Sequence, residues 1–279
     1  MNYETIAVKP IAGALGAEVS GVDLARPLPD ATICEIRAAL LKHLVIFFHD
    51  QQLTPEQHLA VGRRFGTLQV HDFVEAMEGH PEILEVRKEP EETRNFGGGW
   101  HTDVSYLERP SLGSILYALE VPDWGGDTLF ANQYLAYENL SDRMQQLLGG
   151  LRGVSSSTKA DASRTREDRI RTDGTAEPRK VLIAEHPAVR THPETGRKAL
   201  YVNVAHTVGF AGMTEEESMP LLGFLFRHQI RPEFTCRFRW QPGSLAIWDN
   251  RCAQHYAMND YHGHKRVMHR VTLVGDRPR

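Results

Sequence analysis

The chain has 279 residues, of which 41% are hydrophobic and 24% are charged, and its formal net charge is −4. This composition is typical of a globular protein that buries a core without disulfide bonds. The small negative charge argues against general binding to nucleic acid, and the lack of a basic, apolar N-terminal region or of about 18 consecutive apolar residues argues against a signal peptide and a membrane span.

The N-terminal part of the chain alternates predicted strands with predicted helices. We expect strands at 6–8, 17–19, 44–48 and 82–87. One helix opens at Pro29-Asp30, with Asp30 as its N-cap. A second begins at Thr54-Pro55 and ends near Gly66. This region is therefore α+β.

From Gly113 onward, short strands separated by Gly or Pro turns predominate. They are expected at 114–119, 127–130, 235–240, 244–248 and 267–274. A helical stretch at 134–148 divides into two pieces, with Ser141 capping the second. Thr214 forms a capping box with Glu217, and we expect the helix after it to begin afresh near Pro220. So many short strands predict a double-sheet jelly roll or barrel.

Residues 155–180 differ from the rest because they are polar, with interleaved basic and acidic side chains. A segment of this kind is either a solvated surface loop or a mobile lid over a binding site. The mixed charge argues against a nucleic-acid site. No linker and no repeat divides the sequence, so we expect one domain over 1–279.

His101 and Asp103 are candidate metal ligands. On an extended backbone, residues two apart point to the same side, so an imidazole and a carboxylate can converge on one ion. His255 is the candidate for the third ligand, from a distant strand. Two His and one carboxylate leave one face of an ion open, as in non-haem Fe(II) oxygenases. Alternatively, His-x-Asp is a pair that occurs by chance in many loops.

Arg266 and Arg270 are four residues apart on a predicted strand. They should face the same side, roughly 13 Å apart at about 3.3 Å per residue. If that side faces the barrel interior, the two guanidinium groups need anionic ligands. The alternatives are that they pair with Asp or Glu side chains, or that the strand faces solvent.

Four motifs follow the order and nearly the spacing of one enzyme family. They are Trp100-His101-Thr102-Asp103, Gly125-Gly126-Asp127-Thr128, Trp248-Asp249-Asn250-Arg251 with His255, and Arg266 with Met268-His269-Arg270. On these motifs the chain resembles the taurine/phenoxyacetate dioxygenase family, whose members use Fe(II) and 2-oxoglutarate. The resemblance extends from Gly13 to Pro278.

The resemblance implies a double-stranded β-helix, or jelly roll, with flanking helices. It implies that Fe(II) is held by His101, Asp103 and His255, and that 2-oxoglutarate and O₂ are cosubstrates. Arg266, helped by Thr128, would hold the distal carboxylate of 2-oxoglutarate. The reaction would then couple oxidative decarboxylation of 2-oxoglutarate to removal of hydrogen from a substrate C–H. The segment at 155–180 would be the family's mobile, variable lid.

The same resemblance assigns the primary substrate, a small organic anion, to Arg270, His71 and Val104. A single loop histidine such as His71 is otherwise most often a surface residue. The sequence departs from the taurine enzymes at Phe73-Val74 and Gly97, where those enzymes have polar groups for the substrate. We therefore expect an aryloxyalkanoate, alkyl sulfate or sulfonate, hydroxylated on a carbon next to a heteroatom.

Three other functions remain compatible with the sequence: taurine dioxygenase proper, a zinc hydrolase on the same barrel, and a ligand-binding protein without turnover. Release of succinate from 2-oxoglutarate separates the oxygenases from the other two. The cysteines Cys34, Cys236 and Cys252 are odd in number and widely spaced, as is typical of reduced thiols. We expect a cytoplasmic homo-oligomer, a dimer or a tetramer.

Overall fold

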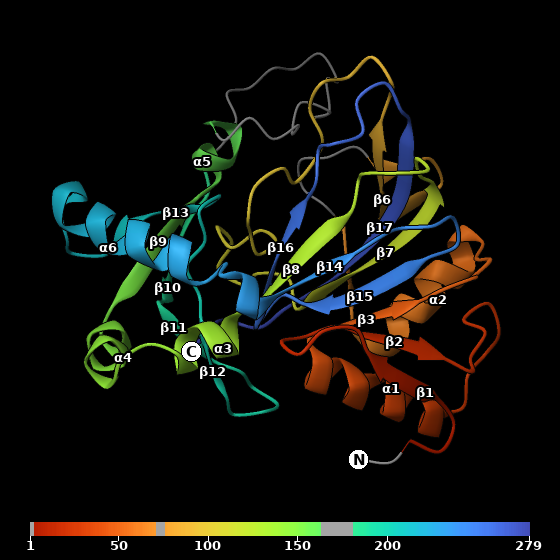
Figure 1. Ribbon diagram of the computed structural model, residues 1–279, viewed down its shortest axis with the longest axis horizontal. Coiled ribbons are helices and arrows are strands. Elements are labelled where there is room, and N and C mark those ends of the chain that lie inside the picture. Colours follow the sequence, from red (N-terminus) through yellow and green to blue (C-terminus); the bar gives the residue numbers. More distant parts are fainter. Residues whose placement is uncertain (1–2, 71–75, 163–180) are drawn as a thin grey trace.

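Two sheets packed face to face, antiparallel except where β2 pairs with β3, form the centre of the protein, seen as a computed structural model in Figure 1. The structure describes residues 3–70, 76–162 and 181–279. In this part of the chain the larger sheet has nine strands, in the order β1-β2-β3-β15-β7-β17-β6-β5, with β4 also paired to β17. Their bounds are Ala7–Pro10 (β1), Ala17–Ser20 (β2), Val45–Phe48 (β3), Leu68–Gln69 (β4), Ala76–Met77 (β5), His80–Lys88 (β6), Gly113–Glu120 (β7), Leu245–Asp249 (β15) and Arg266–Leu273 (β17).

The smaller sheet has the order β14-β8-β16. Its strands are Thr235–Phe238 (β14), Thr128–Asn132 (β8) and Ala253–Ala257 (β16). Phe47 of the larger sheet stacks on Phe238 of the smaller one, with 3.9 Å between ring centroids. Aromatic stacking of this kind adds to the burial energy of a core. The two facing sheets confirm the predicted jelly-roll core.

Two helices, α1 (Asp30–His43) and α2 (Pro55–Phe65), cover the outer face of the larger sheet. Strand β15 shows why one sheet can serve two cores. Its residues Leu245 and Ile247 pack toward these helices, whereas Ala246 and Trp248 face the smaller sheet. Successive side chains of a strand alternate between its faces, so a continuous apolar run is needed here.

A third core lies to one side of the two sheets, at the left of Figure 1. Its helical elements are α3 (Gln133–Glu138), α4 (Asp142–Gly149), α5 (Ser157–Ala162), α6 (Glu215–His228) and the 3₁₀ turn η1 (Pro232–Phe234). Its strands are Arg152–Ser156 (β9), Ile183–Pro187 (β10), Val189–Thr191 (β11), Lys198–Leu200 (β12) and Thr207–Phe210 (β13). These elements are the helices predicted to flank the jelly roll, with small sheets of their own.

The predicted capping residues begin three of the helices. Thr54 and Thr214 each form a capping box, with Gln57 and Glu217 respectively. Ser141 caps α4 through the amide of Met144. Each cap satisfies backbone N–H groups that the first helical turn leaves without partners.

The expectation that Asp30 is the N-cap of α1 is wrong. Pro29 occupies that position without a side-chain hydrogen bond, and Asp30 is the first helical residue. The Asp30 carboxylate pairs with Arg64 of α2 instead. Its negative charge still favours the helix from within the first turn.

The expectation that a helix begins afresh near Pro220 is also wrong, because α6 runs without a break through that residue. A proline inside a helix removes the hydrogen bond to the carbonyl four residues earlier, here that of Glu216. Both Glu216 and Pro220 are exposed, so water can hydrate this carbonyl. The helix can therefore continue through Pro220.

The polar segment predicted at 155–180 begins as regular structure. Ser155 and Ser156 are buried in β9, and α5 continues directly from them. A strand was not expected there because three serines carry no apolar periodicity. Residues 163–180, which hold most of the expected lid, lie outside the described residues. No helix of the described chain combines the length and the apolar character needed to cross a membrane.

Candidate metal centre

His101 and His255 come from distant parts of the chain and are joined through their backbones. The amide of His101 donates to the carbonyl of His255 at 3.1 Å, and the amide of His255 donates to the carbonyl of His101 at 2.9 Å. Through this antiparallel bridge, His101 pairs with His255 of β16. The bridge places both imidazoles on the same side of the backbone, 4.0 Å apart between ring centroids.

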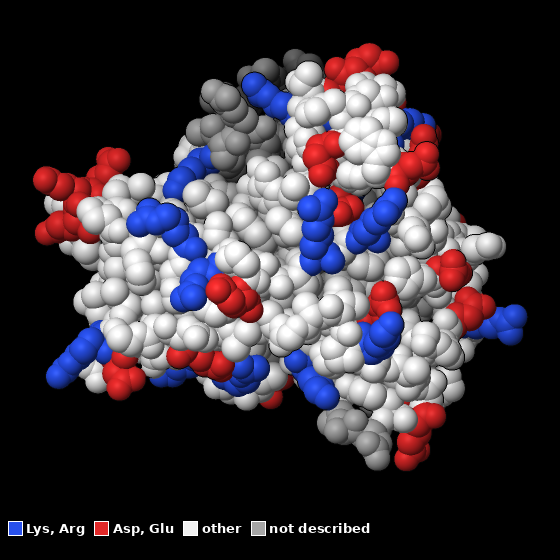
Figure 2. Space-filling model, viewed as in Figure 1, with Lys and Arg blue, Asp and Glu red and all other residues white. Residues whose placement is uncertain are grey.

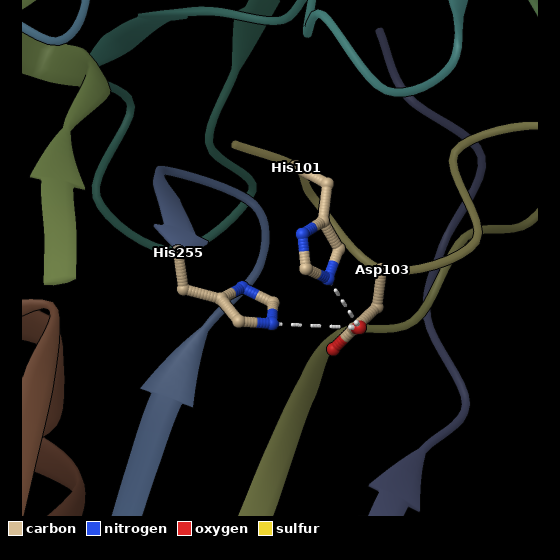
Figure 3. A group of neighbouring side chains, drawn as sticks. All are labelled: His101, Asp103 and His255. Atoms are coloured by element: carbon tan, nitrogen blue, oxygen red, sulfur yellow. Dashed lines mark ion pairs between the residues drawn. The ribbon is translucent and has the colours of Figure 1, made fainter. Parts of the chain in front are cut away.

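Asp103 completes a cluster with these two histidines, and Figure 3 shows all three side chains pointing at one place. Asp103 Oδ1 lies 3.6 Å from His101 Nε2 and 3.7 Å from His255 Nε2. All three residues are buried. Asp103 does not lie on the expected strand, since it opens a turn in which Val104 has a φ of 46°. The convergence expected for residues two apart is nevertheless present.

Hydrogen bonds hold the Asp103 carboxylate in one orientation. Its Oδ2 atom accepts from Ser114 Oγ at 2.8 Å and from Asn250 Nδ2 at 3.0 Å. Asn250 is itself fixed, because its Oδ1 accepts from the indole N–H of Trp248 at 3.0 Å. Oδ2 is thus occupied, and Oδ1 faces the two histidines. Ser114 was not predicted to have a role, and Asn250 was noted only as part of the Trp248–Arg251 motif.

The protonation states suit a cation site. Burial alone would raise the pKa of the Asp103 carboxyl, but Arg270, His255 and His101 hold that pKa well below its usual value. Burial, followed by the neighbouring His101, lowers the pKa of His255 well below its usual value. His101 Nδ1 lies 2.7 Å from the carbonyl of Gly99, which fixes the tautomer with a lone pair on Nε2. A carboxylate and two neutral imidazoles are the forms that bind a metal.

A cavity of about 40 Å³ adjoins this cluster. It is lined by Val86, Phe96, Gly97, His101, Leu116, Thr128, Trp248, His255, Ala257, Arg266 and Arg270. The two predicted arginines therefore face the same interior space from β17, and the solvent-facing alternative is excluded. His269, between them, points to the other side of the sheet, 3.7 Å from Glu85.

Arg266 is buried and forms no ion pair with an acidic side chain of the described residues. Its Nε and Nη2 atoms are enclosed and have no hydrogen-bond acceptor among the described residues. Burial lowers the pKa of the guanidinium, because desolvation disfavours a charge. A buried, incompletely paired guanidinium is costly, and an anion bound in the cavity would offset this cost. Thr128 lines the same space.

Arg270 does have an acidic neighbour. Its Nη1 donates to Asp103 Oδ1 at 3.2 Å, and its guanidinium lies 5.3 Å from the centre of the Phe96 ring. Its Nε is buried and has no acceptor in the described chain. The alternative that this arginine pairs with a carboxylate is thus partly realised, with the candidate metal ligand itself.

Val104 and His71 are the other two predicted substrate residues. Val104 is half-buried in the turn after Asp103 and is not among the residues that line the cavity. His71 and the neighbouring Phe73-Val74 lie outside the described residues. Gly97 lines the cavity, and a Cβ added to it would lie 3.2 Å from His101 Cε1. Space beside the metal ligands thus depends on this glycine.

A second group of potential ligands, His192, Asp249 and Cys252, is also buried. Here the donor atoms already have partners. His192 Nδ1 accepts from the amides of Glu194 and Thr195, so its Nε2 carries the hydrogen that it donates to Asp249 at 3.0 Å. Arg251 donates to both oxygens of Asp249, at 2.8 and 2.6 Å. This group is an internal ion pair that ties the loop at 192–195 to β15.

The donor set at His101, Asp103 and His255 fits a divalent metal by a different criterion. Its three donor atoms lie within 4.8 Å of one another, and no basic side chain occupies both carboxylate oxygens. Two imidazole nitrogens and one carboxylate oxygen, with space on one side, match the ligand type of non-haem iron. Arg266 then lies across the cavity as the partner for a second, anionic group.

Comparison with known proteins gives the same result along most of the chain. The family model described as taurine catabolism dioxygenase TauD, TfdA family, matches residues 7–272. An α-ketoglutarate-dependent sulfate ester dioxygenase from Pseudomonas putida is 37% identical over 97% of this chain and 90% of that protein. An alkylsulfatase from Acinetobacter baylyi is 35% identical over 98% of this chain and 86% of that protein.

A crystal structure of a taurine dioxygenase from Burkholderia xenovorans superposes with a TM-score of 0.84 and 40% identity, covering 99% of this chain and 91% of that one. The range matched by the family model, 7–272, spans the four motifs that carried the resemblance in the sequence. The chain belongs to the TauD/TfdA family of dioxygenases.

Proposed function

We propose that this protein is an Fe(II)- and 2-oxoglutarate-dependent dioxygenase that hydroxylates a small organic anion next to a heteroatom, releasing succinate and CO₂. One observation carries the proposal: the cluster of His101, Asp103 and His255 shares a cavity with the buried Arg266 guanidinium, two of whose nitrogens have no hydrogen-bond acceptor among the described residues. A metal and a dicarboxylate held together are what this chemistry requires. The names of the relatives agree with it.

His101, Asp103 and His255 would hold the iron. Three protein ligands leave the remaining positions of an octahedral ion open for the cosubstrate and O₂. When bound, iron and 2-oxoglutarate together supply the oxidant that removes hydrogen from the substrate. Asp103 would bind through Oδ1, because Ser114 and Asn250 already occupy Oδ2.

Arg266 and Thr128 would hold the distal carboxylate of 2-oxoglutarate. Two free N–H groups of one guanidinium match the two oxygens of a carboxylate. The site excludes water around this pair, since both side chains are buried. Exclusion of water strengthens the charge-assisted contact.

Arg270, with His71 and Val104, would anchor the anionic end of the primary substrate. The rest of the cavity favours an apolar tail, because Val86, Phe96 and Leu116 line it and no lining residue in the described chain is acidic. The ammonium group of taurine would be desolvated there without a partner. The apolar lining therefore favours substrates of the kind in the names of the sulfate ester dioxygenase and the alkylsulfatase over taurine, which the name of the third relative contains.

The test is a competition between an alkyl sulfate and taurine, with succinate and released sulfate or sulfite as readouts. Succinate that depends on iron and rises with the alkyl sulfate supports the proposal. A preference for taurine would refute the substrate class and leave the cofactors standing. Hydrolysis without succinate would indicate a zinc hydrolase, and binding without turnover a ligand-binding protein. His255→Ala is the matched negative control, because it removes one metal donor.

We also propose one domain over residues 1–279, which assembles as a homodimer or homotetramer in the cytoplasm. Contacts between β15, the outer helices and the smaller sheet support one folding unit. The three cysteines are free thiols, as a reducing compartment requires. Limited proteolysis, sedimentation and fractionation of cells test the three statements separately.

A further inference from the structure

Trp240 forms a buried hydrogen bond with the hydroxyl of Thr128. The indole Nε1 of Trp240 lies 2.9 Å from Thr128 Oγ1, and both residues are more than nine-tenths buried. An indole nitrogen can only donate a hydrogen bond, so the Thr128 oxygen is the acceptor. The hydroxyl hydrogen of Thr128 must therefore point in another direction. No acceptor for it is present among the described residues.

Trp240 also lies against the other half of the proposed cosubstrate site. The guanidinium carbon of Arg266 is 5.9 Å from the centre of a Trp240 ring, a cation–π distance. Trp240 is itself held by Phe238, whose ring packs edge to face at 5.0 Å. One rigid side chain thus contacts both of the groups assigned to the distal carboxylate.

We propose that Trp240 is a positioning residue for 2-oxoglutarate, and this inference rests on the proposed function. By donating to Thr128 it fixes the hydroxyl as a donor directed at the carboxylate beside Arg266. A hydroxyl left free to rotate would lose conformational freedom when the ligand bound, and that loss would weaken binding. The indole removes this cost in advance.

The consequence is a dependence between two residues, which a double-mutant cycle measures. The variants are Trp240→Phe, Thr128→Val and their combination, each loaded with Mn(II) and titrated with 2-oxoglutarate by calorimetry. Each single change should weaken binding about fivefold, which is the effect of one lost hydrogen bond of about 1 kcal/mol. The double variant should bind no more weakly than Thr128→Val alone, because the indole then has no hydroxyl to orient.

A role in packing alone predicts a different result. If Trp240 acted only through its ring volume, Trp240→Phe would weaken the binding of 2-oxoglutarate by the same factor whether residue 128 is Thr or Val. This outcome would overturn the proposal. Replacing Trp240 with 3-benzothienylalanine, which keeps two fused rings but has no N–H, repeats the cycle without a change of shape. Trp124→Phe is the matched control, since Trp124 is exposed and should leave the affinity unchanged.

The same titrations separate this inference from the proposed function. If the wild-type protein with Mn(II) bound no 2-oxoglutarate, both would fail together. If the wild type bound it and Thr128→Val weakened the binding, the cosubstrate site would stand. Independent effects of the two single changes would then reject only the role of Trp240.

Discussion

Asp103 is the residue on which most contacts of the site converge. One carboxylate oxygen accepts from Ser114 and Asn250, and the other faces His101, His255 and Arg270. The two oxygens therefore have separate tasks. A carboxylate restrained in this way keeps Oδ1 directed at the two histidines, which reduces the ordering needed when a metal binds.

Ser114→Ala should lower the affinity for Fe(II) by roughly tenfold, in the range found when a partner of a metal ligand is removed. The hydroxyl lost by this change is buried and donates to Asp103 Oδ2 at 2.8 Å. Titration with Mn(II) under anaerobic conditions measures the affinity. Ser111→Ala, a buried serine that contacts Gln69 instead, is the control. Equal affinities in wild type and Ser114→Ala would show that the hydrogen bond has no part in metal binding.

Arg266→Lys should raise the KM for 2-oxoglutarate by a large factor and leave the affinity for the metal unchanged. Lysine keeps the charge but cannot present two parallel N–H groups to a carboxylate. A loss of about 2 kcal/mol is expected for a buried charged hydrogen bond without replacement. Initial rates of succinate formation over a range of 2-oxoglutarate concentrations measure it. An unchanged KM would remove Arg266 from the cosubstrate site.

Among the elements, the loop from Asn95 to His101 connects the cavity wall to the metal centre. Asn95 Nδ2 donates to the carbonyls of Ala257 and Met258 at 2.9 and 3.1 Å. Gly97 follows with a φ of 77°, a conformation that L side chains rarely adopt. The side-chain amide of Asn95 thus holds one end of the loop, and Gly97 allows the backbone to turn.

Gly97→Ala should weaken metal binding, because the new Cβ would lie 3.2 Å from His101 Cε1 and would strain a left-handed backbone. The strain is of order 1 kcal/mol. Gly99→Ala is the matched control, since a Cβ there meets nothing within 4 Å. Metal titration and thermal unfolding of both variants measure the effect. If the two variants behaved alike, the close approach to His101 would not limit the site.

Several elements followed directly from local signals in the sequence. The capping boxes at Thr54 and Thr214 involve residues three apart, and the apolar runs of β3 and β15 are continuous. The continuity of α6 through Pro220 did not follow, because it depends on the exposure of Glu216. Exposure is set by tertiary packing, which local pattern does not contain.

In the candidate site, too, some features could be predicted from the sequence and others could not. The metal donors and the two arginines were visible as residue types at characteristic spacings. The hydrogen bonds from Ser114 and Asn250 to Asp103, and from Trp240 to Thr128, were not visible. Serine, asparagine and tryptophan have many structural uses. Their partners lie 11, 147 and 112 residues away in the chain, which are not characteristic spacings of any motif.

At the scale of the whole molecule, the larger sheet separates two environments. Its inner face contributes to the metal cavity, and its outer face is covered by α1 and α2. His58 of α2 is 1% exposed in the outer core and packs edge to face on Tyr117 at 6.0 Å. Burial, together with the charge of His269, lowers the pKa of His58 to about 3.

This buried imidazole should make the protein less stable in mild acid. The unfolded chain binds a proton near the ordinary histidine pKa of about 6.5, whereas folded His58 stays neutral down to about 3. The protein is therefore most stable above the pKa that His58 has in the unfolded chain. Its stability falls as the pH drops toward the pKa that His58 has in the folded protein. Between about pH 7 and about pH 5.5, His58 should account for a loss of about 1 kcal/mol.

Denaturant unfolding of wild type and His58→Leu at both pH values measures this contribution. Leucine fills a similar volume without titrating, so the variant should lose less stability on acidification. The difference between the two losses isolates His58 from the other histidines. The same loss in both proteins would contradict the assignment.

The backbone bridge between His101 and His255 joins residues separated by more than half of the chain. Contacts of such long range form late, because closing a large loop costs entropy before the contact is gained. The metal donors therefore meet only after the sheets have paired, and the unfolded chain offers no preformed site. Stopped-flow experiments with Mn(II) should show slower unfolding and an unchanged refolding rate. If that result is found, metal uptake is the last step in the maturation of the protein, because the ion binds a chain that has already folded.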